Sequence, residues 1–200
     1  MDWHQKDVLL NINIKQFANT NVIMQNFNQG ILIVEGSHAR ILSNKLDSNI
    51  KANIALGGKG SGLTRIKYNY IEHSKSEGIF VAEGEERLLI EDNQIMHNND
   101  GIVMLDSNGF VKENNIKNNH RAGIMTCGET TAVIDSNTIE DNQAAGIIIK
   151  DPSLPEIKRN EICKNFFQIK MEKHGRSVWP RIELENPKII GNNEIPGNTC

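Results

Sequence analysis

The sequence predicts an all-β fold: a single-stranded right-handed parallel β-helix of about eight coils, each about 23 residues long with three short strands. Three observations predict this solenoid. A motif built around asparagine recurs at nearly constant spacing, a glycine-isoleucine segment follows most copies, and an aliphatic residue precedes the motif by three positions. All three segments place apolar residues at alternating positions, which indicates strands, and none has the 3.6-residue period of a helix.

The first element is the pattern Asn-x-aliphatic-x-x-Asn/Ser, which occurs eight times at steps of 23, 25, 24, 21, 23, 23 and 33 residues. Its copies begin at Asn21, Asn44, Asn69, Asn93, Asn114, Asn137, Asn160 and Asn193. We expect the aliphatic residues to stack into a continuous interior, with successive coils about 4.8 Å apart. Asparagine suits the motif for two reasons: it tolerates the left-handed backbone of a sharp turn, and stacked copies can hydrogen-bond along the axis.

The second element is the strand Gly-Ile-x-aliphatic, which begins at Gly30, Gly78, Gly101, Gly123 and Gly146. Asn53-Ile54 and Gln168-Ile169 fill the same slot without glycine. The third element is the aliphatic column Ile41, Ile66, Ile90, Val111, Ile134, Ile157 and Ile190. Because each coil then holds three strands and no helix, the pattern favours a β-helix over a leucine-rich repeat, which requires a helix or 3₁₀ turn on its convex side.

The repeats run through nearly the whole chain, so the sequence predicts one domain over residues 1–200. We expect residues 1–18 to form a degenerate first coil or an N-terminal cap. Residues 173–188 are predicted to be an insertion, because the last coil is ten residues longer than its neighbours. Solenoids need caps on their open edges and none is evident, so one interpretation is that the chain is part of a larger protein or assembly.

Composition and charge bound the classes of partner. A net charge of −3 and a pI of about 6.1 argue against nucleic acid, and no apolar run reaches the length that a membrane span requires. The N-terminus lacks a basic segment followed by an apolar one, so no signal peptide is predicted. The three cysteines, Cys127, Cys163 and Cys200, are too few and too scattered for a disulfide framework. These features together predict an intracellular, cytoplasmic protein.

The two repeated motifs resemble the signature of the parallel β-helix repeat family, in the pectin-lyase-like superfamily, over residues 7–198. In pattern, the chain is most similar to the β-helix region of F-box substrate-recruiting proteins, which includes a stretch like Gly57-Gly58-Lys59-Gly60. That resemblance implies a recruiter of protein substrates, although the chain has no F-box segment. The superfamily also contains lyases, hydrolases and epimerases, so it implies the alternative of a carbohydrate-binding or carbohydrate-active protein.

An apolar stripe lies at the outward position of the glycine-isoleucine strands. The sequence predicts a binding surface there, formed by Leu32, Phe80, Val103, Met125 and Ile148. Such a stripe is not expected on a free surface, so we expect it to be covered by another segment of the protein or by a protein partner.

The long loop of the last coil offers a second candidate binding group: His174, Arg176, Trp179 and Arg181. The alternative is a lid that packs Trp179 against the stripe or the core.

No catalytic residue, cofactor or metal site is predicted. His73 and His97 hold equivalent positions in adjacent coils, but no third ligand is apparent in the sequence. The paired aspartates and the Gly-His-Gly segment of polygalacturonases are absent. The favoured function is therefore a non-catalytic protein-binding or scaffold module, with a carbohydrate-active protein as the alternative.

Overall fold

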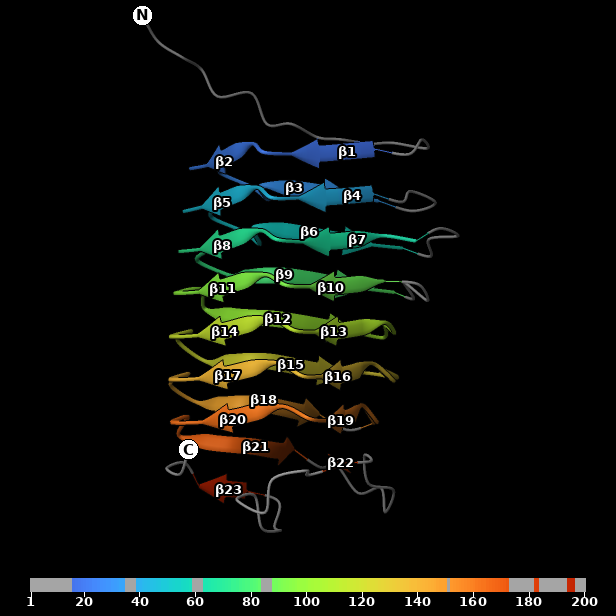
Figure 1. Ribbon diagram of the computed structural model, residues 1–200, viewed down its shortest axis with the longest axis vertical. Coiled ribbons are helices and arrows are strands. Elements are labelled where there is room, and N and C mark those ends of the chain that lie inside the picture. The colour runs from blue at the N-terminus through green and yellow to red at the C-terminus, as the bar shows by residue number, and fades with distance from the viewer. Residues whose placement is uncertain are drawn as a thin grey trace, which may run out of the picture.

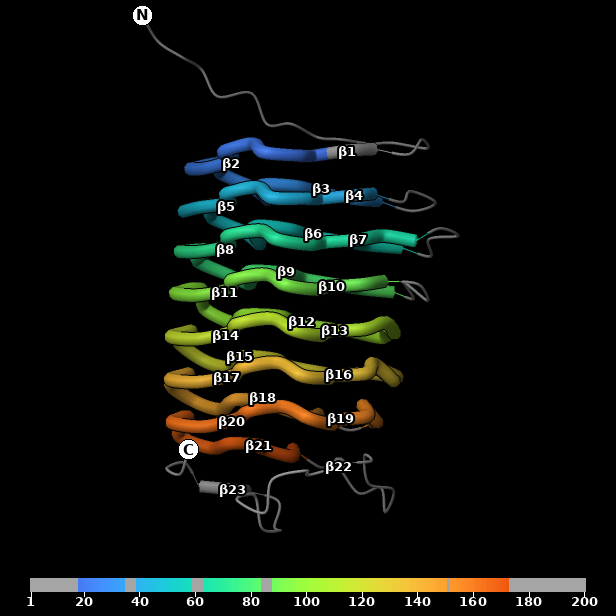
Figure 2. The backbone as a smooth tube through the Cα atoms, viewed as in Figure 1, coloured from blue at the N-terminus to red at the C-terminus, as the bar shows by residue number. Residues whose placement is uncertain are grey.

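The computed structural model describes residues 16–34, 39–58, 63–83, 88–150, 152–172, 182–183 and 194–196. This part of the chain contains strands and turns and no helix. The strands form three sheets that wrap around a common axis as a right-handed parallel β-helix (Figure 1). Each turn of the backbone makes one coil, and successive coils follow one another along the axis (Figure 2). The predicted fold is confirmed.

Each sheet takes one strand from every coil, so its neighbouring strands are three elements apart in the chain. Sheet A comprises β1 (Gln16–Asn19), β4 (Ala39–Leu42), β7 (Arg65–Lys67), β10 (Leu89–Glu91), β13 (Phe110–Lys112), β16 (Val133–Asp135), β19 (Glu156–Lys158) and β22 (Ile182–Glu183). Sheet B comprises β2 (Val22–Met24), β5 (Lys45–Asp47), β8 (Tyr70–Glu72), β11 (Gln94–Met96), β14 (Asn115–Lys117), β17 (Thr138–Glu140) and β20 (Glu161–Cys163). Sheet C comprises β3 (Ile31–Ile33), β6 (Ile54–Gly57), β9 (Glu77–Ala82), β12 (Asp100–Leu105), β15 (Ala122–Cys127), β18 (Ala145–Lys150), β21 (Phe167–Glu172) and β23 (Glu194–Pro196).

The number of coils differs slightly from the predicted eight. The described residues form seven successive sets of three parallel strands, from β1–β3 to β19–β21. The eighth asparagine motif does not form a further parallel coil, because its strand β23 pairs antiparallel with β21 in sheet C. Residues 1–15, most of the predicted cap, and residues 173–181 and 184–188 of the predicted insertion lie outside the described residues.

Aliphatic side chains in register fill the interior. Sheet A contributes Ile41, Ile66, Ile90, Val111, Ile134 and Ile157, all at most 1% exposed. Sheet B contributes Leu46, Ile71, Ile95, Ile116, Ile139 and Ile162, and sheet C adds the isoleucine of each glycine-isoleucine pair. The predicted core columns are therefore confirmed where the structure describes them.

Two asparagine ladders run along the axis at the two ends of sheet B. The first ladder consists of Asn21, Asn44, Asn69, Asn93, Asn114, Asn137 and Asn160. In it, each side-chain Nδ2 donates to the Oδ1 of the next asparagine at 2.9–3.0 Å. The second ladder contains Asn26, Asn49, Asn98, Asn119, Asn142 and Asn165. The predicted hydrogen bonds between stacked asparagines are confirmed.

The other reason given for asparagine is wrong. The left-handed residue of each turn immediately precedes the ladder asparagine and is of many types, among them Ser43 (φ 56°), Tyr68 (φ 59°) and Arg159 (φ 54°). The asparagine itself is required by its amide, which hydrogen-bonds neighbouring coils and closes the turn with backbone carbonyls.

The second ladder is interrupted once, where the repeat has Ser74 in place of asparagine. Asn53, which stands in the glycine slot of the preceding coil, fills the gap: its Nδ2 donates to Asn98 Oδ1 at 3.2 Å, and its Oδ1 accepts from Asn49 Nδ2 at 2.5 Å. In the five coils with glycine in that slot, a Cβ atom would lie only 2.8–3.1 Å from a ladder Nδ2. The two departures from the repeat therefore compensate for each other sterically.

Candidate metal centre

The outer face of sheet B carries one residue per coil directly after the buried aliphatic column. Backbone register aligns Met24, Asp47, Glu72, Met96, Lys117, Glu140 and Cys163. The next residue of each coil has the left-handed backbone that turns the chain toward the second ladder: Gln25, Ser48, His73, His97, Asn118, Asp141 and Lys164. Residues 21 to 26 positions apart in the sequence thereby become neighbours on this face.

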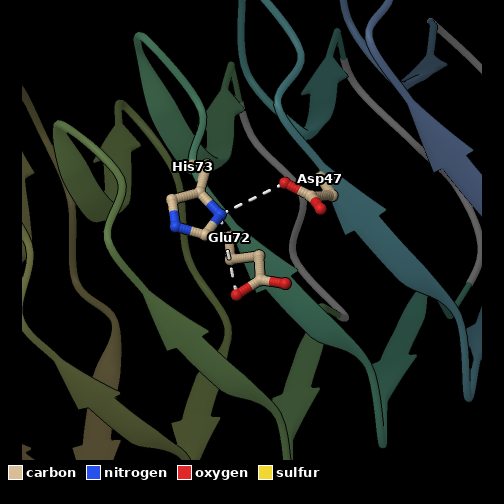
Figure 3. Close-up of side chains that lie close together, drawn as sticks. All are labelled: Asp47, Glu72 and His73. Atoms are coloured by element: carbon tan, nitrogen blue, oxygen red, sulfur yellow. Dashed lines mark hydrogen bonds and ion pairs between the residues drawn. The ribbon is translucent and has the colours of Figure 1, made fainter.

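Asp47, Glu72 and His73 come together on this face and form what we call the His73 cluster. Their potential ligand atoms all lie within 4.8 Å of one another. His73 Nδ1 is 3.2 Å from Asp47 Oδ1 and 3.6 Å from Glu72 Oε2, and Figure 3 shows the imidazole nitrogen facing both carboxylates. A deprotonated carboxylate only accepts hydrogen bonds. Either a proton on His73 Nδ1 or a bound cation therefore stabilises the approach of these three atoms.

Lys45 organises the two carboxylates from the opposite side. Its Nζ lies 3.1 Å from Glu72 Oε1 and 3.5 Å from Asp47 Oδ2, which leaves the other oxygen of each acid facing His73. Burial alone would raise the pKa of Asp47, but hydrogen bonds from Ser48 and His73 and attraction to Lys45 outweigh burial and lower it. The hydrogen bond to Glu72 raises the pKa of Lys45. The acids are 10–14% exposed and His73 is 51% exposed, so an ion can reach the cluster from solvent.

The adjacent coil places two further donors beside this cluster. The His97 ring stacks on that of His73, with 5.3 Å between centroids and 8° between planes. Met96 is the register partner of Glu72, and its Sδ accepts a hydrogen bond from the Tyr70 hydroxyl at 3.4 Å.

A second group of acids, Glu91, Asp92 and Glu113, also has its ligand atoms within 4.8 Å. Lysines pair with two of these three acids: Lys67 lies 3.0 Å from Glu91 and 3.1 Å from Asp92, and Lys112 lies 2.6 Å from Glu91. This arrangement is an ion-pair ladder across sheet A, which contributes modestly to stability.

The predicted apolar stripe does align on the outer face of sheet C. Register links Leu32, through Ala55, to Phe80, Val103, Met125 and Ile148. Its central members are nevertheless only 4–7% exposed, because they pack with Ala122 and Ala145 and with the half-buried Phe167 and Cys127 in a separate cluster. As a binding surface, the stripe stays a prediction.

The predicted loop group of His174, Arg176, Trp179 and Arg181 lies outside the described residues. The sequence had singled out His73 and His97 without a third ligand, and the structure supplies Asp47 and Glu72. The signal that identifies these acids is their position: each directly follows the aliphatic residue of the asparagine motif, in adjacent coils.

The fold and this cluster define a β-helix protein with a candidate site for a cation. Residues 5–199 match the model of the family described as periplasmic copper-binding protein (NosD), and the chain belongs to that family. None of the curated proteins matches the chain.

Two solved structures show the same fold. The crystal structure of the periplasmic alginate epimerase AlgG matches with a TM-score of 0.64 and 16% identity over 74% of this chain and 42% of that one. A point mutant of that enzyme matches with a TM-score of 0.58 and 16% identity over 78% of this chain and 42% of that one. The chain thus spans less than half the length of these proteins. The parallel β-helix family is confirmed, and neither match is an F-box protein.

These findings correct two expectations. The expectation of a non-catalytic protein-binding or scaffold module is wrong, because the family is described as copper-binding and the matched structures are those of a carbohydrate-modifying enzyme. The central side chains of the stripe, from which that expectation was drawn, are buried. The carbohydrate-active alternative gains from the same matches, although enzyme activity does not follow from a likeness in fold.

The expected intracellular, cytoplasmic location is also wrong, because both the family and AlgG are periplasmic. The cysteine argument behind it misled for a physical reason: Cys163 is disulfide-bonded, and such bonds persist in oxidising compartments such as the periplasm. In the described part of the chain, no helix is both long and apolar enough to cross a membrane.

Proposed function

We propose that this protein binds copper in the periplasm, and that the His73 cluster is its binding site for cupric ion. The observation that carries the proposal is the approach of His73 Nδ1 to Asp47 Oδ1 and Glu72 Oε2, at 3.2 and 3.6 Å. The family's description names copper, which supports that choice of metal.

The donor set fits this ion. Imidazole nitrogen suits copper, and mixed nitrogen and oxygen donors are typical of tetragonal cupric sites. The two carboxylates offset the charge of the ion, and Lys45 holds them through Asp47 Oδ2 and Glu72 Oε1, so the other oxygen of each faces His73. In the described residues, the comparable acidic group around Glu91 has two of its three carboxylates paired with lysines and contains no histidine.

Copper titration of matched variants tests the site. Cupric ion would be added to the wild-type protein, His73→Asn and Asp47→Asn, with binding followed by calorimetry and electron paramagnetic resonance. Asparagine tolerates the left-handed backbone of residue 73 (φ 53°), so the fold should persist. We expect both variants to lose at least about tenfold in affinity.

His120→Asn is the matched control. His120 is also exposed and hydrogen-bonded, to Gln143 at 3.3 Å, but it belongs to neither acidic group. Its substitution should leave copper affinity unchanged. Wild-type affinity in folded His73→Asn protein would rule out this site.

A second candidate function is carbohydrate modification, favoured by Asp100 on the outer face of sheet C. Burial raises the pKa of this carboxyl, as in general acids, and the half-exposed Arg121 beside it at 3.1 Å offers a partner for a uronate. Copper binding is better supported, because Asp100 is only 3% exposed and its oxygens are held by Arg121 and the Ala122 N–H. Incubation with alginate and other polyuronates, analysed by proton NMR, tests this candidate, and unchanged polymer would exclude these substrates.

A further inference from the structure

The coil after the His73 cluster repeats its layout with different donors. Met96 occupies the register position of Glu72, and His97 occupies the turn position of His73. The two histidines share nearly the same left-handed backbone, with φ of 53° and 57°. A pair of thioether and imidazole thus lies one coil away from a pair of carboxylate and imidazole.

The ring geometry favours one ion per histidine. A single ion bonded to both rings needs their nitrogens within about 4 Å, because bonds from imidazole to first-row metals are about 2 Å long. The centroids of the two rings are 5.3 Å apart and the rings are nearly parallel, at 8°. The lone pairs of ring nitrogens lie in the ring planes, so those of stacked parallel rings lie in two separate planes and suit two adjacent metal positions better than one shared position.

The metal position beside His97, here called the second position, has softer ligand atoms than the position beside His73. The Met96 side chain is nearly buried, at 6% exposed, and the Tyr70 hydroxyl anchors its sulfur at 3.4 Å. Thioether sulfur selects cuprous ion, whereas carboxylates favour harder cations. The Tyr70 contact uses only part of the sulfur's acceptor capacity, and the long thioether chain adjusts readily to a new partner.

The adjacent residues on this face limit the second position to a single coil. One coil further on, the same column holds Lys117, whose ammonium group repels a bound cation. On the other side, the column continues into Glu72 and Asp47 of the His73 cluster. The thioether therefore lies between a carboxylate site and a fixed positive charge.

We propose that Met96 and His97 form a second copper subsite that holds cuprous ion, directly beside the His73 cluster. The proposal rests on the function proposed above, because it assigns an oxidation state of the same metal to each of two adjacent coils. The His73 cluster holds the oxidised ion through oxygen and nitrogen, and the Met96–His97 subsite holds the reduced ion through sulfur and nitrogen.

Anaerobic competition with a coloured cuprous chelator tests the subsite. All proteins would carry Cys127→Ser, because Cys127 is a free thiol that could itself bind cuprous ion. Met96→Leu is compared with Met125→Leu, a matched control at a methionine of similar burial, 5% exposed, on the outer face of sheet C. We expect Met96→Leu to weaken cuprous binding at least about tenfold and to leave cupric binding within about twofold.

X-ray absorption at the copper edge gives an independent readout. We expect a sulfur neighbour in the cuprous protein and its loss in Met96→Leu, with no change in Met125→Leu. Unchanged cuprous affinity in Met96→Leu, or a cuprous spectrum without sulfur, overturns the subsite. If cupric binding still depends on His73 in that case, the proposed function survives alone, whereas a wild-type protein that binds neither ion refutes both.

Discussion

The compensation between Asn53 and Ser74 predicts a strong energetic coupling. The repeat elsewhere pairs glycine in the slot with asparagine in the ladder, so the informative variants are Asn53→Gly, Ser74→Asn and the double variant that restores the usual pair. If the two departures are compensatory, each single variant should be destabilised and the double variant should recover most of the loss.

The structure gives the magnitudes. Asn53→Gly removes bonds to Glu72 O at 2.9 Å, to Asn98 Oδ1 at 3.2 Å and from Asn49 Nδ2 at 2.5 Å, all in a fully buried environment. Glu72 O keeps the Ser48 N–H as a partner, and Asn49 Nδ2 keeps a longer bond of 3.4 Å, so the loss is partial. We expect Asn53→Gly to lower the free energy of unfolding by about 2–4 kcal/mol, which includes the cost of the void that the side chain leaves.

Ser74→Asn introduces a second amide into space that Asn53 already fills. In the coils with glycine, even a Cβ atom would lie 2.8–3.1 Å from the ladder amide, so a whole side chain cannot be accommodated without displacement. Overpacking of this kind costs about 1–3 kcal/mol. The double variant should lie within about 1 kcal/mol of wild type, which gives a coupling energy of at least about 2 kcal/mol.

Equilibrium unfolding in urea, followed by circular dichroism, measures all four free energies of unfolding. The m-values should agree among the variants, which shows that the same cooperative unit unfolds. Additive single effects, with a double variant that is less stable than either single variant, would refute the steric argument.

Three further predictions concern single positions. Thr126→Val should raise the free energy of unfolding by about 1–2 kcal/mol, because among the described residues the buried Thr126 hydroxyl has no hydrogen-bond partner. A lower free energy of unfolding, measured by denaturation in urea, would contradict this. Glu113→Asn should stabilise the protein by about 0.5–1 kcal/mol, since residue 113 has φ 57° and asparagine tolerates that conformation better; thermal unfolding measures the change. Burial would raise the pKa of Glu91, but hydrogen bonds from Lys112 and Lys67 outweigh burial and lower it, so its contribution to stability is present above the usual glutamate pKa and is lost as pH falls through the lower folded value. Unfolding at pH 6 and pH 3 should therefore show a smaller acid-induced loss of stability in Glu91→Gln than in wild type.

The fold could be predicted because the repeat fixes the register. Once Ile71 and Ile95 are known to stack, every outward position is known to have a neighbour one coil away, and the alignment of the Phe80 and Val103 stripe follows directly. Burial of that stripe did not follow from the pattern, because small residues at Ala122 and Ala145 contribute to the packing and do not stand out in a sequence.

The left-handed turn positions could not be predicted because the chain tolerates many residue types there, from Tyr68 to Arg159. The third ligand of the His73 cluster was missed for a different reason. Asp47 lies 26 residues before His73, and the approach of the two depends on where the turn directs the imidazole, which register alone does not specify.

The asparagine ladders give the solenoid a polarity. Each amide nitrogen donates toward the C-terminal side and each amide oxygen points back toward the N-terminal side, so the side-chain dipoles add along the axis. A rod with such a direction has chemically different ends, because the amide oxygens face one end and the amide nitrogens face the other. Two ladders can therefore continue into one another only head to tail, and coils can be gained or lost as whole units without reversing that direction.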